Sequence, residues 1–190
     1  VLARACDAVS FGSMSQRHPV AHAFTQAFLA EAKRALKIFD VNLRMDLFTP
    51  EVLDQGCHAG DLVKLNEEEL PIVADLLELP VGDACARTEA MRAKYDLDAV
   101  IFTRGKQGTA ASTREGWLEG EPASFPLAEN ADSVGAGDAC TAALLTAQLL
   151  GRDWQAALDL ANGHGAFVAS QPTATPRLPM EIWAGYGLDN

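Results

Sequence analysis

Asp-Ser-Val-Gly-Ala-Gly-Asp, residues 132–138, is the stretch of sequence from which the fold of this chain can be worked out. A run of apolar, helix-forming residues follows it and stops at Gly151, a residue type that suits the end of a helix. The glycines therefore lie at the N-terminus of a predicted buried helix. Free backbone N–H groups and the helix dipole make such an end a binding site for anions, phosphate above all.

Asp138 adds a carboxylate to this predicted anion site. A carboxylate repels a resting phosphate, but it can remove the proton from a hydroxyl group that is about to attack one. The alternative interpretation is an ordinary loop with an aspartate helix cap. Two other phosphate-binding motifs are excluded. Cys140 stands where a dinucleotide-binding fingerprint needs its third glycine, and the sequence contains no Gly-x-x-x-x-Gly-Lys-Ser/Thr.

The composition limits the classes of protein to which this chain can belong. A chain of 190 residues with 48% hydrophobic residues can bury a sizeable core, and we expect a single domain over residues 1–190. The net charge of −11 argues against a nucleic-acid partner, which needs a basic face. No apolar run approaches the roughly 18 residues of a membrane span, so no membrane partner is expected. The four scattered cysteines lack metal-type spacing, which favours reduced thiols and a cytoplasmic protein.

Strand-like and helix-like segments alternate along the chain, which predicts a doubly wound α/β fold with a mainly parallel sheet and helices on both faces. The expected strands are 7–13, 36–41, 61–65, 98–103, 109–113 and 117–119. The expected helices are 19–35, 49–56, 66–78, 82–95, 139–150 and 153–167.

Polar residues follow two of the expected strands. Open α/β sheets bind ligands beyond the carboxyl ends of their strands, so Arg44 lies at the expected working edge. The alternative for Arg44 is an ion pair with Asp40 or Asp46. After the next strand, Asn66 can cap the following helix, whose acidic first turn also suits a solvated helix start.

Three segments carry a resemblance to a known family. Asp-Ser-Val-Gly-Ala-Gly-Asp-Ala, residues 132–139, resembles the C-terminal signature of the PfkB (ribokinase-like) carbohydrate kinases. Phe-Asp-Val-Asn-Leu-Arg, residues 39–44, resembles the Asp-x-Asn-x-Arg segment of fructokinase-like and ketodeoxygluconate-kinase-like members. The tail 171–179 resembles the family's closing loop, although Thr173 replaces its usual glycine.

The resemblance implies ATP-dependent phosphorylation of a sugar hydroxyl. It implies that Asp138 takes the proton and that the backbone N–H groups of Gly135, Ala136 and Gly137 hold the phosphoryl oxygens. Arg44 would face the transferred phosphate or the substrate. The resemblance also adds a candidate K⁺ site near Asp132 and the carbonyl of Val134.

Further residues take roles by the same resemblance. Asn66 and Glu69 would organise Mg²⁺ and the nucleotide phosphates, in part through water. Thr103 and Gly105 would lie near the nucleotide, with an ordinary β-hairpin turn as the alternative. Asn162 would lie against the adenine, with a plain exposed helix residue as the alternative.

Fructose is the first substrate expected from the resemblance, while 2-keto-3-deoxygluconate and ribose stay open. A different class of function is a nucleotide- or sugar-binding protein of kinase fold that does not catalyse. The resemblance covers only the later part of the family's usual length, without its sugar-binding Gly-Gly segment and small β lid. We therefore expect little activity from these 190 residues alone. A homodimer is expected only of a full-length protein, because the lid usually makes the family's dimer contact.

Overall fold

The structure is a computed structural model, and it describes residues 2–45 and 47–187. The chain divides into two compact units, each of which is described by itself. The first contains residues up to 103 together with 111–117, and the second contains residues 104–110 and the chain from 118 onward. The expectation that residues 1–190 fold as one domain stays a prediction.

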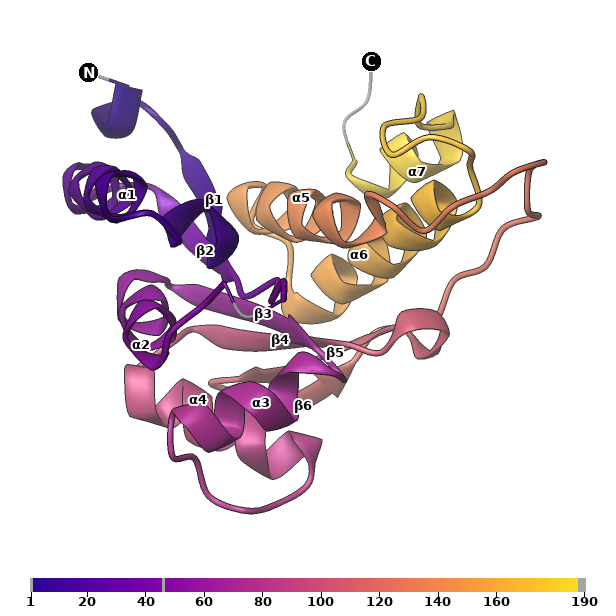
Figure 1. The fold of residues 1–190 in the computed structure, drawn as a ribbon. Helices are drawn as coiled ribbons and strands as arrows, with labels where there is room; N and C mark the ends of the chain where they lie inside the picture. Colours follow the sequence, from indigo (N-terminus) through magenta and orange to yellow (C-terminus); the bar gives the residue numbers. More distant parts are fainter. Residues whose placement is uncertain (1, 46, 188–190) are drawn as a thin grey trace. The chain divides into compact units, whose positions relative to one another are not determined.

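The first unit follows the predicted alternation of strands and helices (Figure 1). Its elements are β1 (Ala8–Gly12), α1 (Pro19–Glu31), β2 (Leu36–Asp40), α2 (Pro50–Ala59), β3 (Leu62–Asn66), α3 (Glu69–Leu76), α4 (Ala84–Tyr95) and β4 (Ala99–Thr103), with short 3₁₀ turns at Leu2–Arg4 and Met14–Gln16. Two further strands, β5 (Thr109–Thr113) and β6 (Gly116–Glu119), run from one unit into the other.

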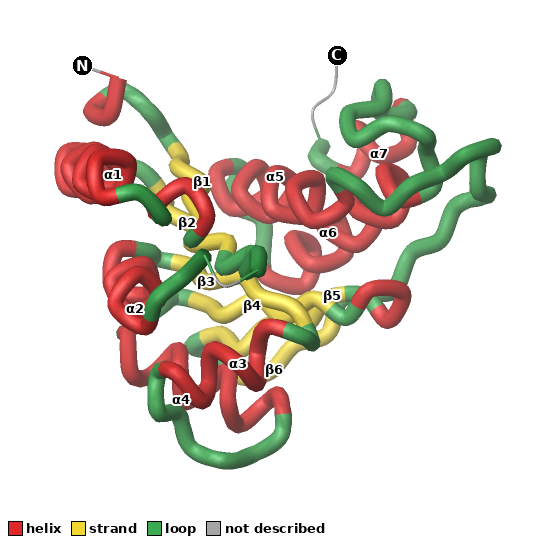
Figure 2. Tube along the Cα trace, in the orientation of Figure 1, coloured by secondary structure: helices red, strands yellow, loops and turns green. Residues whose placement is uncertain are grey.

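The strands form one sheet in the order β1-β2-β3-β4-β5-β6. The first four strands are parallel, and their register sets Ile38 beside Leu62 and Leu62 beside Ala99. Because parallel neighbours are joined by right-handed crossovers, the four connecting helices fall on one face of these strands (Figure 2). The two-residue turn between β5 and β6 makes that pair antiparallel. The predicted α/β fold with a mainly parallel sheet is confirmed.

The first unit has a continuous apolar core between its strands and helices. Aromatic and aliphatic strand residues such as Phe39, Val63 and Val100 are fully buried in it. Gly56 of α2 lies directly over the Phe39 ring, where a Cβ would come within 2.5 Å of the ring. Helix α2 begins as predicted, because the Thr49 hydroxyl accepts a hydrogen bond from the Val52 amide at 3.3 Å.

Helix α1 is the element that the sequence pattern describes least well. The predicted helix over 19–35 ends at Glu31, and Ala32 leaves the helical conformation. The helical spacing of apolar residues puts Val20 and Phe24 on one predicted packed face, but they are 73% and 71% exposed, whereas Leu29 is buried. Several apolar residues around one short helix give no unique phase, so the pattern placed the wrong stripe inward.

The second unit is built on two helices, α5 (Ala136–Leu149) and α6 (Trp154–Ala169), with the 3₁₀ turn Gly105–Gln107 and the short helix α7 (Met180–Gly185). Helix α5 ends as predicted. Gly151 is left-handed (φ +69°), and the Arg152 amide donates to the Ala147 carbonyl in a Schellman arrangement. Asp153 caps α6, as expected, by accepting from the Ala156 amide at 2.8 Å.

All four cysteines are free thiols, in agreement with the sequence. In the part of the chain that the structure describes, no helix combines the length and apolarity needed to cross a membrane.

Two glycines with left-handed backbones allow a matched test of the fold. Gly151 (φ +69°) faces open space, whereas a Cβ on Gly135 (φ +85°) would lie 2.6 Å from the Ala174 carbonyl oxygen. We expect Gly151→Ala to lower the free energy of unfolding by about 1 kcal/mol, the cost of a left-handed alanine. Gly135→Ala should cost about 3 kcal/mol or more, because the carbonyl must also move. Urea unfolding of both variants checks this, and equal losses would contradict the close approach.

Candidate active site

The N-terminus of α5 has the conformation that the glycine motif predicts. Gly135 is the N-cap residue, and its φ of +85° is one that a residue with a side chain rarely adopts. Its Cα hydrogen points at the backbone of Ala174, so glycine is required here for space as well as for conformation. Gly165 of α6 supports the same end from the other side, where a Cβ would lie 3.2 Å from the Ala136 carbonyl oxygen.

The amides at this helix end are not all available to a ligand. The Ala136 amide donates to the Ser133 carbonyl at 3.1 Å in a tight turn. Within the described residues, no hydrogen bond is found for the amides of Gly135, Gly137 and Asp138. Of the predicted anion-binding set of Gly135, Ala136 and Gly137, the Ala136 amide is therefore already used in the turn. Anion binding by the other two amides, and by the unpaired amide of Asp138, stays a prediction. The sequence could have indicated the Asp138 amide, because the first turn of every helix leaves its amides unpaired.

The Asp138 side chain is exposed in the first turn of α5. No hydrogen bond or ion pair joins it to another residue in the described ranges 2–45 and 47–187. It does not cap its own helix, since Gly135 fills that position without a side chain. The interpretation of Asp138 as a mere helix cap is therefore wrong, and its carboxylate is left open to solvent beside unpaired amides.

The residues before the helix form a small turn of their own. The Asp132 carboxylate accepts from the Val134 amide at 3.0 Å, and the Asp132 amide donates to the Gln171 carbonyl at 3.0 Å. Asp132 and Val134 are both exposed. A carboxylate oxygen and a backbone carbonyl are hard oxygen ligands, so this turn offers donors of the type that K⁺ takes.

In the first unit, the carboxyl ends of β2 and β3 hold a buried ion pair. Lys64 Nζ lies 2.7 Å from Asp40 Oδ2, and only 7% and 13% of the two side chains are exposed. Asp40 thus pairs with Lys64, and the alternative ion pair between Asp40 and Arg44 is not found among the described residues. The Arg44 side chain is exposed and has no partner among the described residues, and Asp46 lies outside them.

Asn66 and Glu69 form a reciprocal cap at the start of α3. Asn66 Oδ1 accepts from the amides of Glu68 and Glu69, both at 2.9 Å, and Glu69 Oε2 accepts from the Asn66 amide at 2.9 Å. Glu69 Oε1 also accepts from the Leu43 amide at 2.8 Å. One carboxylate thus joins the helix to the loop that carries Arg44.

This geometry separates two residues that the sequence treats as a pair around Mg²⁺. Both lone pairs of Asn66 Oδ1 are occupied by amides, so the remaining group is the Nδ2 donor, which suits a phosphate oxygen and not a cation. Glu69 keeps further lone pairs and fits a magnesium site that works mostly through water and phosphate oxygens. Among the described residues, no three histidine, cysteine or acidic side chains gather in a metal-binding cluster.

Burial also affects the charge of Glu69. Desolvation raises the pKa of this carboxyl above its ordinary value, against the hydrogen bonds from Asn66 and Leu43, which lower it. Asp40 nearby raises the pKa further, and Lys64 opposes it. The ionised form is therefore held at a cost that its hydrogen bonds only partly offset.

The remaining candidates lie around one turn. Thr103 ends β4, and its hydroxyl makes a long 3.5 Å contact with the Leu65 carbonyl in the first unit. Gly105, in the second unit, has a φ of +52° and open space around its Cα. Asn162 is only 6% exposed, so its interpretation as an exposed helix residue is wrong.

The cap at Glu69 can be tested by stability. Glu69→Gln replaces one carboxylate oxygen by an NH₂ group, so either the Leu43 amide or the Asn66 amide loses its acceptor. We expect this variant to lower the free energy of unfolding by about 1–3 kcal/mol. The folded-state pKa lies above the unfolded one, so the native glutamate binds more protons between the two values. The stability advantage of wild type over Glu69→Gln should therefore narrow as the pH rises through the folded pKa.

Urea unfolding of both proteins across pH checks this prediction. Glu67→Gln is the matched control, because Glu67 is exposed in the same acidic run. A constant or widening advantage with rising pH would show that the pKa of Glu69 is not raised.

Comparison with known proteins was made by sequence and by structure. The chain is 31% identical over 154 residues to the fructokinase of Salmonella thompson, a match covering 75% of this chain and 66% of that protein. The match to the fructokinase of Salmonella typhimurium has the same identity and covers 48% of that protein. The chain thus spans between half and two thirds of the length of these relatives.

The structure is similar to that of a fructokinase with bound ATP from Xylella fastidiosa, with a TM-score of 0.79 and 21% identity over 98% of this chain and 63% of that one. At this identity the likeness shows the fold. A family model described as pfkB family carbohydrate kinase matches residues 6–181. With nearly the whole chain matched, and the glycine motif in the conformation described above, this chain belongs to the pfkB family of carbohydrate kinases.

Proposed function

We propose that this chain is the phosphate-handling part of an ATP-dependent sugar kinase. The observation that carries the proposal is the open N-terminus of α5, where the exposed Asp138 carboxylate lies beside amides that no described residue uses. The fructokinase relatives and the family membership support the class of reaction.

In the proposed reaction, a sugar hydroxyl attacks the terminal phosphorus of ATP. Its proton passes to the Asp138 carboxylate, a new bond forms between the sugar oxygen and phosphorus, and the bond from phosphorus to the ADP oxygen breaks. The amides of Gly135, Gly137 and Asp138 donate to the phosphoryl oxygens as negative charge develops on them. This division of roles relies on positioning and electrostatics, as phosphoryl transfer requires.

Residues of the first unit take supporting roles in the proposal. Arg44 supplies a mobile positive charge for the transferred phosphate or the substrate. Asn66 donates from Nδ2 to a phosphate oxygen, and Glu69 holds the Mg²⁺ hydration shell. When bound with the nucleotide, Mg²⁺ neutralises phosphate charge. Near Asp132 and the Val134 carbonyl, K⁺ is a further proposed ligand, and the potassium-bound Vibrio cholerae fructokinase is a structural neighbour.

Fructose is the proposed substrate, because four of the matched relatives are fructokinases. A keto-deoxy sugar acid is the second candidate, since the 2-dehydro-3-deoxygalactonokinase of Haloferax volcanii is 28% identical over 136 residues. A coupled assay with ATP, Mg²⁺ and a panel of these sugars separates the candidates. Titration calorimetry with ATP and Mg²⁺ tests nucleotide binding by the chain itself. Binding without turnover of any sugar, in a protein that spans the full family length, would favour a non-catalytic binder.

The role of Asp138 predicts a specific kinetic defect. In a form of the protein with measurable turnover, we expect Asp138→Asn to lower kcat by about a hundredfold or more, the scale of a lost general base. The affinity for nucleotide should stay within about threefold of wild type, a change worth less than one net hydrogen bond, because the amides are unchanged. Near-normal turnover of the variant would remove Asp138 from the reaction.

Arg44 provides a second kinetic test. We expect Arg44→Ala to lower kcat/KM by about ten- to a hundredfold through lost charge stabilisation, the scale of about 1.4–2.8 kcal/mol. Arg44→Lys should recover part of this loss. The thermal midpoint of unfolding should hardly change, since the side chain is exposed and has no partner among the described residues. A large loss of stability would indicate a structural ion pair instead.

A further inference from the structure

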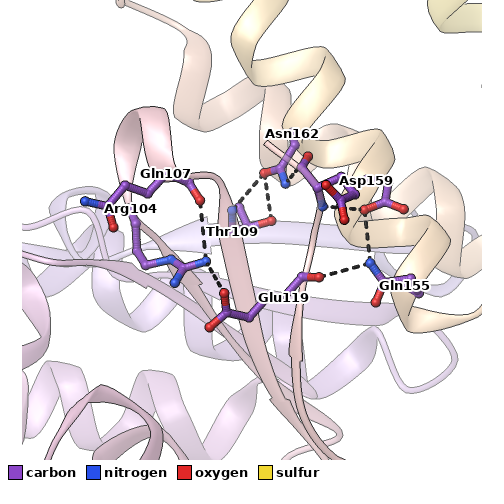
Figure 3. Close-up of polar contacts among 8 residues, drawn as sticks. Arg104, Gln107, Thr109, Glu119, Gln155, Asp159 and Asn162 are labelled. Carbon is purple, nitrogen blue, oxygen red and sulfur yellow. Dashed lines mark hydrogen bonds and ion pairs between the residues drawn. The ribbon is translucent and has the colours of Figure 1, made fainter. Parts of the chain in front are cut away.

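One face of α6 carries three polar side chains that bind backbone instead of solvent. Gln155, Asp159 and Asn162 recur at the spacing of a single helix face, and Figure 3 shows them turned toward the strand ends of the second unit. Gln155 donates to the Glu119 carbonyl at 3.0 Å, and Asp159 accepts from the Glu121 amide at 2.7 Å. These side chains satisfy backbone groups at the last residue of β6 and just beyond it.

Asn162 is the most enclosed member of this row. Its Oδ1 accepts from the Thr109 amide at 2.8 Å and from the Thr109 hydroxyl at 2.9 Å, and its Nδ2 donates to the Glu121 carbonyl at 2.9 Å (Figure 3). Two glycines make room for it: a Cβ on Gly108 or on Gly120 would lie 2.9 or 2.8 Å from Nδ2. The carboxamide therefore sits in a space shaped to hold it in one orientation.

Thr109 is the first residue after the turn that contains Gly105. The turn is closed by bonds from the Gly108 amide to the Gly105 carbonyl and from the Arg104 amide to the Gly108 carbonyl. Two of its residues, Gly105 and Gly108, have left-handed backbones (φ +52° and +79°), which glycine adopts readily. The bonds from Asn162 to Thr109 fix the residue at which this turn joins β5.

We infer that Asn162 is a positioning residue that sets the 104–108 turn for the nucleotide through Thr109, and not a side chain that meets the base. The inference rests on the proposed ATP-dependent function, together with the expectation from the family resemblance that Gly105 lies near the nucleotide. The side chain is 6% exposed and keeps a single Nδ2 hydrogen outside its three bonds, so little of it is left to contact a ligand.

A double-mutant cycle on nucleotide affinity tests the inference. The variants are Asn162→Ala, Thr109→Val and the pair, and the probe is ATP with Mg²⁺ in titration calorimetry of this chain. We expect Asn162→Ala to weaken binding by about tenfold. Thr109→Val should weaken it less, because the Thr109 amide still donates to Asn162 Oδ1, and the double variant should be no weaker than Asn162→Ala. A double variant weaker than Asn162→Ala by the full effect of Thr109→Val would mean that the two side chains act independently, and this would overturn the inference.

Two control variants exclude a general loss of structure. Thr109→Ser keeps the hydroxyl and should bind nucleotide like wild type. Gln155→Ala removes a side chain of the same row that bonds to the Glu119 carbonyl and to Asp159 Oδ1 and makes no hydrogen bond to residues 104–109, and it too should leave affinity unchanged. Weakened binding in Gln155→Ala would mean that the whole row acts only through stability, which would also overturn the inference.

Amide hydrogen exchange without nucleotide separates this inference from the proposed function. In Asn162→Ala, the Thr109 amide should exchange about tenfold faster or more, since its acceptor is gone, while amides in the middle of α5 keep their rates. Unchanged protection of Thr109 would overturn the positioning role. If wild-type protein binds no nucleotide but Thr109 loses protection as expected, the proposed function fails while the link from Asn162 to the turn stands.

Discussion

The chemistry proposed for this protein depends on a helix whose first turn is left unfinished. A side-chain cap at the N-terminus of α5 would occupy the amides of Gly137 and Asp138. Gly135 instead ends the preceding turn with a left-handed backbone that lies against Ala174. The same glycine therefore sets the direction of the helix and leaves its positive end unsatisfied. An anion bound at this end would satisfy these amides.

A different solution appears at α3, where the helix end is closed. Asn66 and Glu69 satisfy each other's amides, and the second oxygen of Glu69 reaches the Leu43 amide. This bond anchors the loop that carries Arg44 to the start of α3, at the residue directly before Arg44. A buried carboxylate with a raised pKa is an unfavourable choice for a purely structural anchor. In the proposed function, its remaining lone pairs would serve the magnesium hydration shell.

The sequence predicts the regular parts of this molecule well because local physics determines them. Thr49, Asp153 and Gly151 form the expected caps, since capping depends on neighbouring residues alone. Val20 and Phe24 are predicted wrongly, because which side of α1 is buried depends on what packs against it.

Candidate site residues divide in the same way. The exposure of Asp138 agrees with the motif. The pairing of Asp40 with Lys64, and that of Asn162 with Thr109, join residues 24 and 53 positions apart, and no local pattern reports such contacts. Long-range polar contacts are set by strand register and helix placement, which a single sequence read by itself does not determine.

The net charge of −11 sharpens the question of how this chain could attract a polyanion. Lys64 cannot supply the attraction, because Asp40 neutralises it in a nearly closed pair. The attraction must then come from groups that carry no formal charge, the amides of the α5 end, and from the few cations left open, such as Arg44. Amide dipoles act over short distances and leave the long-range field unchanged. In the proposed function, the amides of the α5 end would hold a phosphate only at short range, and a divalent cation bound to the nucleotide would reduce its negative charge before contact.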